Sequence, residues 1–272
     1  MKAFINITLV ASLSALSAQA TVVRDNLAQE LNADDIGAVT NGSEWEARTG
    51  AVATLNDTIT GKLTKVATTE NGGQNSSLLS NTLRAPYGMA EKLGATTDPI
   101  RGNTVSIELW IKTGFTNYPI HSQTIFETGG SPKGMTITLG DNASVPGMNN
   151  TLRFAMKDTS NSVFVDLTLD AMAIANLTNG DHHQLVLTYD NANTILLYID
   201  GVKVGQNMAA GVIDWDGTSG AGFWGRNGDM AHDLGLDSDG QGNGSIAVFR
   251  HYTDVLTAGE VEQNYLSTVN CL

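Results

Sequence analysis

The chain has 272 residues and a formal net charge of −13, with 41% hydrophobic and 16% charged residues. A domain of this length buries about three quarters of the surface of its unfolded chain, so a sizeable core can form. The acidic charge repels phosphates and anionic headgroups, which disfavours nucleic acids, anionic lipid surfaces and acidic polysaccharides as partners.

Residues 1–20 have the pattern of a secretory signal peptide. Lys2 supplies the positive charge, residues 3–16 are mostly apolar, and Ala18-Gln19-Ala20 forms a small-residue cleavage site. Cleavage would change the net charge to −14, because Lys2 is the only charged residue removed. No later apolar run approaches the roughly 20 residues of a membrane helix. We therefore expect a secreted protein, extracellular or in the cell envelope, without membrane insertion.

The next residues, 21–44, are polar and show no firm strand pattern, although residues 26–35 favour a short helix. We interpret residues 21–44 as an N-terminal extension and residues 45–272 as one domain. Early strands are expected over residues 45–55 and 61–68, which a short polar turn separates.

From residue 105 onward, apolar residues alternate with polar ones, which is typical of strands with one buried face. The inward set of the first strand is Val105, Ile107, Leu109 and Ile111, and the outward set is Ser106, Glu108, Trp110 and Lys112. Similar stripes follow at residues 135–139, 152–156 and 163–169. One buried face per strand predicts an all-β fold with two antiparallel sheets packed face to face.

A hairpin is predicted over residues 180–205. Apolar residues alternate over residues 185–189 and again over residues 195–199, with a polar turn between them. Asp200-Gly201 then fits a tight turn, because glycine tolerates a positive φ.

The segment after this hairpin carries the candidate ligand site, because aromatic residues stand there beside polar side chains. Sugar sites combine an aromatic platform with a few polar groups that fix orientation. The candidate glycan-binding residues are Trp215, Trp224, Arg226, Asn227, Asp229 and His232. The alternative is that these aromatic residues close one end of the sandwich.

The same loop is rich in oxygen donors, and the candidate calcium ligands are Asp233, Asp237, Asp239 and Asn243. Residues 237–242 place donors at alternate positions and a glycine at the end, as calcium loops do. The twelfth position is Val248 instead of a bidentate glutamate, which excludes a full helix–loop–helix site. The alternative is a solvated loop built on Asx turns.

The last predicted element is a helix that starts at Thr257. Thr257 and Glu260 have the spacing of a capping box, and the helix should run to about Ser267 and pack through Val261 and Tyr265. Cys271 is the only cysteine, so no internal disulfide can form. It is either a tolerated terminal residue or a link between two chains.

Several of these segments resemble, in order, the motifs of laminin-G-like and concanavalin A-like jelly rolls. They are VSIELWIK at residues 105–112, HHQLV at 182–186 with TYD and LYIDG after it, GSIAVFRHY at 244–252, and VEQNY at 261–265. Two positions depart from the family pattern, because His182 stands in place of a tryptophan and Gln184 in place of a second histidine. The resemblance implies a jelly-roll sandwich in which Trp110 is a packing residue, and His183, which matches the family motif, is interpreted as a structural histidine at the end of a strand.

Catalytic motifs are absent from the sequence. Concanavalin-like glucanases carry two carboxylates on one strand face, as Glu-x-Asp-x-x-Glu or Glu-x-Asp-x-Glu, and neither pattern occurs here. The Gln-x-His strand of jelly-roll lyases and the Gly-x-Ser-x-Gly motif are also missing.

We therefore expect a secreted, non-catalytic, lectin-like protein that binds a glycan or glycoprotein with the assistance of calcium. One alternative is a structural or adhesive subunit that forms a homo-oligomer or a cell-surface assembly. A second alternative is a divergent glycan-cleaving enzyme.

Overall fold

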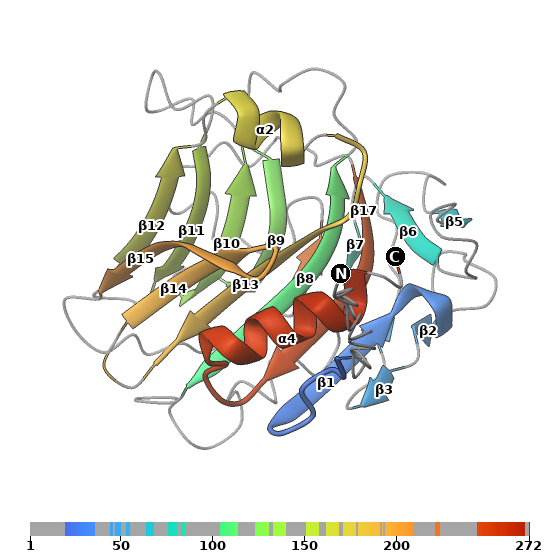
Figure 1. Cartoon of the computed structure of the whole chain (residues 1–272), viewed down its shortest axis with the longest axis horizontal. Helices are drawn as coiled ribbons and strands as arrows, with labels where there is room; N and C mark the ends of the chain where they lie inside the picture. Colours follow the sequence, from blue (N-terminus) through green and yellow to red (C-terminus); the bar gives the residue numbers. More distant parts are fainter. Residues whose placement is uncertain are drawn as a thin grey trace, which may run out of the picture.

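The fold is a sandwich of two antiparallel sheets, with a helix lying across the outer face of the larger sheet (Figure 1). The computed structural model describes residues 20–35, 44–45, 47–49, 53–54, 64–67, 76–80, 83–84, 104–113, 123–130, 133–139, 151–157, 162–168, 171–177, 179–190, 192, 194–208, 221–223, 244–269 and 272. Residues 1–19 of the predicted signal peptide and Cys271 lie outside this set. No described helix is long and apolar enough to cross a bilayer.

Within the described residues, the larger sheet has nine strands. Its main path runs in the order β15 (Val202–Met208), β14 (Thr194–Ile199), β13 (His183–Tyr189), β8 (Val105–Thr113), β17 (Gly244–Tyr252), β1 (Leu27–Asn32) and β3 (Ala47–Thr49). Beside this path, β6 (Ser76–Ser80) pairs with β17 and with β5 (Thr64–Ala67).

The described strands of the smaller sheet number six and follow the order β12 (Ser162–Thr168), β11 (Thr151–Lys157), β10 (Lys133–Leu139), β9 (Gln123–Gly130), β16 (Ala221–Phe223) and β7 (Leu83–Arg84). A separate pair joins β2 (Glu44–Trp45) to β4 (Ala53–Thr54). The described helices are η1 (Ala33–Asp35), α2 (Ala171–Leu177) and α4 (Ala258–Thr268). The predicted two-sheet sandwich with a short C-terminal helix is confirmed.

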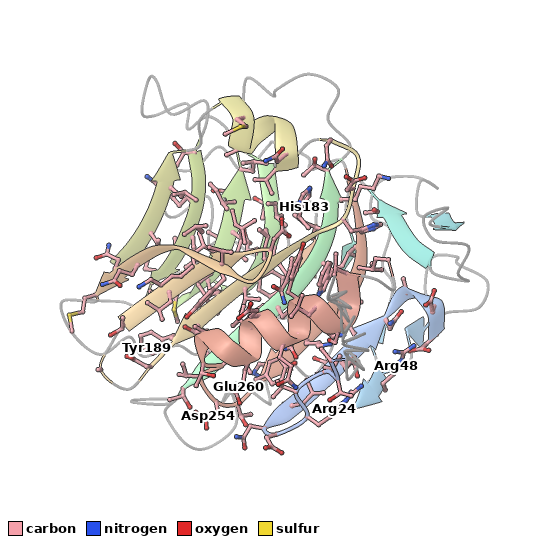
Figure 2. All side chains as sticks on the ribbon, in the orientation of Figure 1. Arg24, Arg48, His183, Tyr189, Asp254 and Glu260 are labelled. Atoms are coloured by element: carbon pink, nitrogen blue, oxygen red, sulfur yellow. The ribbon has the colours of Figure 1, made fainter. Side chains whose placement is uncertain are left out.

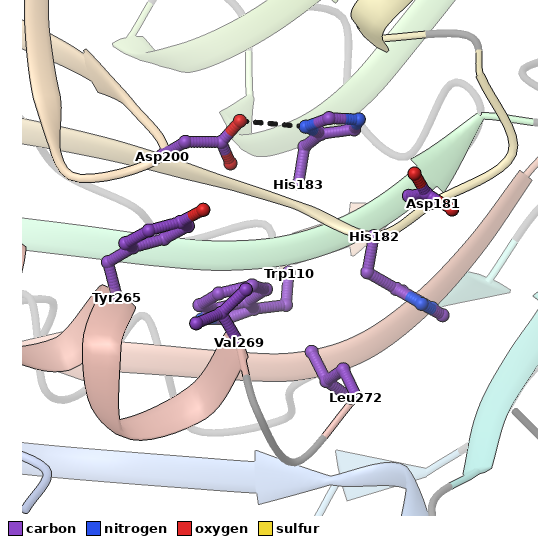
Figure 3. A pocket seen from close by; sticks show the side chains of 8 residues that line it. All are labelled: Trp110, Asp181, His182, His183, Asp200, Tyr265, Val269 and Leu272. Atoms are coloured by element: carbon purple, nitrogen blue, oxygen red, sulfur yellow. Dashed lines mark hydrogen bonds and ion pairs between the residues drawn. The ribbon is translucent and has the colours of Figure 1, made fainter. Parts of the chain in front are cut away.

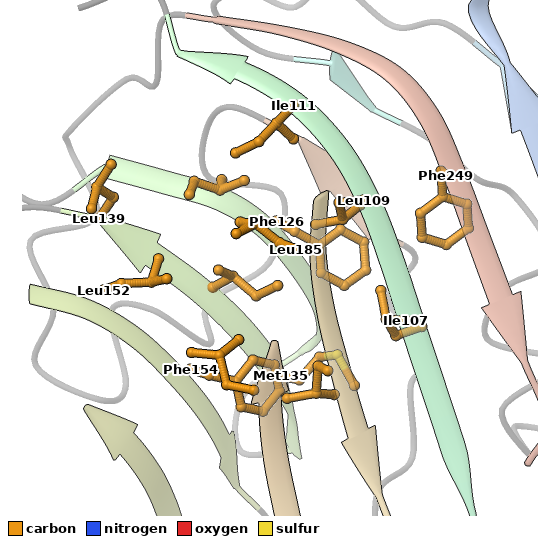
Figure 4. Packing of buried hydrophobic residues seen from close by; sticks show 14 of the residues in the cluster. Ile107, Leu109, Ile111, Phe126, Met135, Leu139, Leu152, Phe154, Leu185 and Phe249 are labelled. Carbon is orange, nitrogen blue, oxygen red and sulfur yellow. The ribbon is translucent and has the colours of Figure 1, made fainter. Parts of the chain in front are cut away.

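The core lies between the two sheets and contains the apolar stripes that the alternation predicted (Figure 4). The larger sheet contributes Ile107 and Leu109 from β8, while the smaller sheet contributes Met135 from β10 and Phe154 from β11. Each fully buried side chain of this size contributes roughly 1.5–3 kcal/mol. The inward face of β8 is therefore placed as its sequence predicted.

The outward face of β8 differs from the prediction, because it is buried as well. Ser106, Glu108 and Trp110 are each 0% exposed. Helix α4 and the N-terminal segment cover this side of the sheet, as the hydrogen bonds described below show. The expectation of one buried face per strand is therefore wrong for β8, because alternation does not reveal what a later helix will cover.

The predicted hairpin is confirmed. Strands β13 and β14 pair with Leu187 opposite Leu197, and Asp200 and Gly201 connect β14 to β15. Both turn residues have positive φ, 49° for Asp200 and 78° for Gly201, as a type I′ turn requires. The turn lies directly against α4, because a Cβ on Gly201 would be 3.3 Å from the Cβ of Tyr265.

The N-terminal segment also differs from its prediction. Residues 27–32 form strand β1 between β17 and β3, and only residues 33–35 are helical, as a 3-10 turn. Leu31 is buried in the core, so pairing and packing outweigh the weak local helix preference. The expectation of a helix over residues 26–35 is therefore wrong, and so is the expectation that residues 21–44 contain no firm strand. The division into an N-terminal extension and a domain over residues 45–272 stays a prediction.

Helix α4 begins as predicted. The Thr257 hydroxyl accepts from the Glu260 amide, and the Glu260 carboxylate accepts from the Thr257 amide, which completes the capping box. Val261 packs in a buried cluster with Val186 and Tyr198, and Tyr265 contacts Trp110. The capping residues thus fix where the helix starts, and its apolar face fixes where it docks.

Candidate functional site

The glycan and calcium residues predicted from the sequence lie outside the described residues. They are Trp215, Trp224, Arg226, Asn227, Asp229, His232, Asp233, Asp237, Asp239 and Asn243. Their arrangement therefore stays a prediction. Within the described part of the chain, no group of three or more metal-binding side chains is suitably placed to hold an ion.

The described residues form a pocket of about 200 Å³ on the outer side of the larger sheet (Figure 3). It lies where the start of β13, the β14–β15 turn and the end of α4 meet. The lining side chains are Trp110, Asp181, His182, His183, Asp200, Tyr265, Val269 and Leu272. Aromatic, imidazole and carboxylate groups thus surround one cavity.

An aromatic pair forms one wall of the pocket. Trp110 of β8 stacks on Tyr265 of α4 with ring centroids 5.8 Å apart and an interplanar angle of 4°. The Trp110 Nε1 donates to Glu108 Oε1 at 2.8 Å, which fixes the indole. Trp110 is fully buried, in agreement with its interpretation as a packing residue.

His183 and Asp200 hold the start of β13 to the hairpin turn. The His183 Nδ1 lies 2.8 Å from Asp200 Oδ2, and Asp200 Oδ1 accepts from the Gln184 amide at 2.9 Å. Burial alone would lower the pKa of His183, but the hydrogen bond and charge of Asp200 outweigh it and raise that pKa. His183 is therefore a structural histidine, as the family resemblance implied.

His182 has the opposite environment. Its Nε2 is enclosed and has no hydrogen-bond partner among the described residues. Burial, together with the charges of Lys112 and His183, lowers the pKa of His182 to about 4. The imidazole is therefore neutral near pH 7.

This pKa makes stability depend on pH. Below about pH 6.5 the unfolded chain protonates His182 while the folded chain does not, so stability should fall as the pH drops from about 6.5 to about 4. We expect His182→Gln to flatten this part of the profile, measured as melting temperature between pH 7 and pH 4. His183→Gln is the control of opposite sign. Because the pKa of His183 is raised in the folded protein, His183 contributes stability at low pH that is lost as the pH rises through this pKa. An unchanged profile in His182→Gln would contradict the assignment.

Behind the pocket, Glu108 is the centre of a buried polar network. Its Oε1 accepts from Trp110, from Gln184 Nε2 at 3.0 Å and from Arg250 at 2.8 Å, and its Oε2 accepts from Asn264 Nδ2 at 2.9 Å. Gln184 also accepts from the Gly201 amide at 3.0 Å. The glutamine that departs from the family pattern thus connects the network to the hairpin turn.

The same network reaches the N-terminal segment. Arg250 Nε donates to Glu30 Oε1 at 3.0 Å, Glu30 also pairs with Arg24, and the Val23 amide donates to Asn264 Oδ1 at 2.8 Å. Burial would raise the pKa of Glu30, but Arg250 and Arg24 outweigh it and lower that pKa. These contacts explain why the outer face of β8 tolerates a buried carboxylate.

Sequence reasoning missed the pocket and the network because their residues are far apart in the chain. One clue was present, since Glu108 and Trp110 share a face of their strand. Nothing in the local pattern indicated that residues from α4 would cover that face.

Comparison with known proteins gives a family and a set of fold relatives. The family model "Concanavalin A-like lectin/glucanases superfamily" matches residues 90–262. No curated protein sequence matches the chain.

Solved structures of botulinum neurotoxin binding domains have the same fold. The serotype D/C VPI 5993 domain matches with a TM-score of 0.58 at 12% identity, covering 89% of this chain and 53% of that one. The DC domain in complex with rat synaptotagmin II has a TM-score of 0.60 at 12% identity, covering 89% and 52%. A type C structure, whose title reports cell entry dependent on two ganglioside molecules, has a TM-score of 0.58 at 13% identity, covering 89% and 51%. The chain thus spans about half the length of these proteins.

Proposed function

We propose that this chain, which belongs to the concanavalin A-like lectin/glucanase superfamily, is a non-catalytic, lectin-like protein that binds glycans outside the cytoplasm. The predicted signal peptide over residues 1–20 supports the location. The absence of the paired-carboxylate glucanase motif from the sequence supports binding without cleavage.

The observation that carries this proposal is the pocket beside α4. It combines the partly exposed ring of Tyr265, which stacks on the buried Trp110, with the carboxylates of Asp181 and Asp200. Such a mixture of aromatic surface and a few polar groups is what sugar recognition uses. The ganglioside dependence reported for the type C neurotoxin is consistent with glycan binding on this fold, although identity of 13% relates the folds alone.

A glycan array tests the proposal directly. The intact mature protein should bind a restricted set of glycans and release no cleavage products from them on prolonged incubation. An array that stays silent both with calcium and with a chelator would overturn the proposal and favour the structural or adhesive subunit. Product release would instead favour the glycan-cleaving enzyme.

Calcium assistance is a separate prediction about the loop that contains Asp237 and Asp239. Calorimetry on chelated protein should show calcium binding, and millimolar calcium should raise the melting temperature by mass action. The Asp237→Asn/Asp239→Asn double variant should lose both effects. Magnesium at the same concentration is the control, because its small octahedral shell suits such a loop poorly. Equal melting temperatures with and without calcium would refute the site.

A further inference from the structure

We propose that the pocket beside α4 binds the ring of a neutral sugar through hydroxyl hydrogen bonds to Asp181 and Asp200, and that it rejects sugars bearing a carboxylate. This inference rests on the proposed glycan-binding function and adds the site and the class of sugar.

The space exists where the chain departs from its family pattern. His182 lines the pocket at the position where the family motif has a tryptophan. An indole is larger than an imidazole, so a tryptophan at residue 182 would take up part of the volume that His182 now borders. Figure 3 shows His182, Tyr265 and Leu272 around this space. A tryptophan restored at residue 182 should fill it.

The carboxylates around the pocket retain acceptor capacity. Among the described residues, His183 and Gln184 each donate to one oxygen of Asp200, whereas an ionised carboxylate offers about four acceptor positions. Asp181 is exposed, and its Oδ2 accepts from Asn179 at 2.7 Å. Sugar hydroxyls are donors that match these acceptors, and the apolar atoms of Val269 and Leu272 can contact the C–H face of a ring.

The charge at the pocket selects between sugars. Asp181 and Asp200 place two carboxylates around one small cavity in a chain of formal net charge −13. A uronic or sialic acid would add a third carboxylate nearby, which like-charge repulsion disfavours. A neutral hydroxylated ring meets no such repulsion. We therefore expect a preference for the neutral sugar of about tenfold or more.

The test uses methyl glycosides of glucose, galactose and mannose together with their uronic acids, titrated by NMR into the intact mature protein. At least one neutral sugar should bind, with its uronic acid at least about tenfold weaker. His182→Trp should weaken neutral-sugar binding at least about tenfold. Asp181→Asn should narrow the difference between the neutral sugar and its uronic acid.

The control for Asp181→Asn is Asp25→Asn, which removes the same charge at the other end of the sheet. Asp25 is exposed and lies two residues before Leu27, which pairs with Tyr252 at the end of the sheet near Asp254. His183 begins β13 at the opposite end of the sheet (Figure 2). Asp25→Asn should leave affinity and selectivity unchanged. Circular dichroism checks that each variant is folded. If His182→Trp does not fold, Asp181→Asn still tests the inference, because it changes only an exposed side chain.

The outcomes separate this inference from the function on which it rests. The inference would be overturned if a neutral sugar bound His182→Trp as tightly as it binds the parent. It would also be overturned if a uronic acid bound as tightly as its neutral sugar. If Trp224→Ala abolishes array binding while the pocket variants retain it, glycan binding stands and the site is the predicted loop. If both the array and the sugar panel are silent, the proposed function itself fails.

Discussion

Replacing Ile107 with aspartate should destabilise the protein by more than about 4 kcal/mol, because it places an unpaired charge in the core. Ile107 lies in β8, is 0% exposed and pairs with Leu187 of the neighbouring strand β13. It lies in the apolar layer between the sheets (Figure 4). Since domains are stable by only about 5–15 kcal/mol, a large part of the total stability should be lost.

Urea titration followed by circular dichroism measures this loss. Met172→Asp is the matched control, because Met172 lies in α2 and is 72% exposed. The control should change the free energy of unfolding by no more than about 0.5 kcal/mol, as exposed substitutions usually do. If Ile107→Asp unfolds at the same urea concentration as the parent, the register of β8 is wrong.

The inward faces of the strands could be predicted because alternation is a local property of the sequence. Val105, Ile107 and Leu109 lie two residues apart, and any strand places such residues on one face. The hairpin turn at Asp200 and Gly201 was equally local, because two residues of suitable backbone freedom connect two apolar runs. Both features follow from neighbours in the chain and hold whatever packs against them.

The features that were not predicted correctly depend on residues far apart in the chain. Strand β1 exists because Glu30 and Leu31 align with β17 and β3, which a polar local sequence does not reveal. Burial of Glu108 requires Asn264 and Arg250, which follow it by 156 and 142 residues. The pocket is also built from separate segments, and its main local sign was His182 in place of a tryptophan.

Arg250 links the two buried carboxylates of the network. Its guanidinium binds Glu108 at 2.8 Å and Glu30 at 3.0 Å, and both side chains are almost completely buried. Burial opposes the positive charge, but Glu108, Tyr252 and Glu30 outweigh it and raise the pKa of Arg250. The cation thus pairs with two buried carboxylates, and Arg24 supplies a second positive charge to Glu30.

Arg250→Met should therefore cost about 3–5 kcal/mol, the loss that follows when one partner of a buried ion pair is removed. For a domain of this size that corresponds to a fall in melting temperature of about 6–20 °C. Arg48→Met is the matched control, because Arg48 pairs with Asp35 while its side chain is 42% exposed, and it should cost no more than about 1 kcal/mol.

A triple variant separates lost charge from lost packing. Adding Glu30→Gln and Glu108→Gln to Arg250→Met removes the stranded carboxylates, so it should recover part of the lost stability. Equal melting temperatures for Arg250→Met and Arg48→Met would mean that the network does not stabilise the fold. A triple variant no more stable than the single one would attribute the loss to packing of the arginine stem.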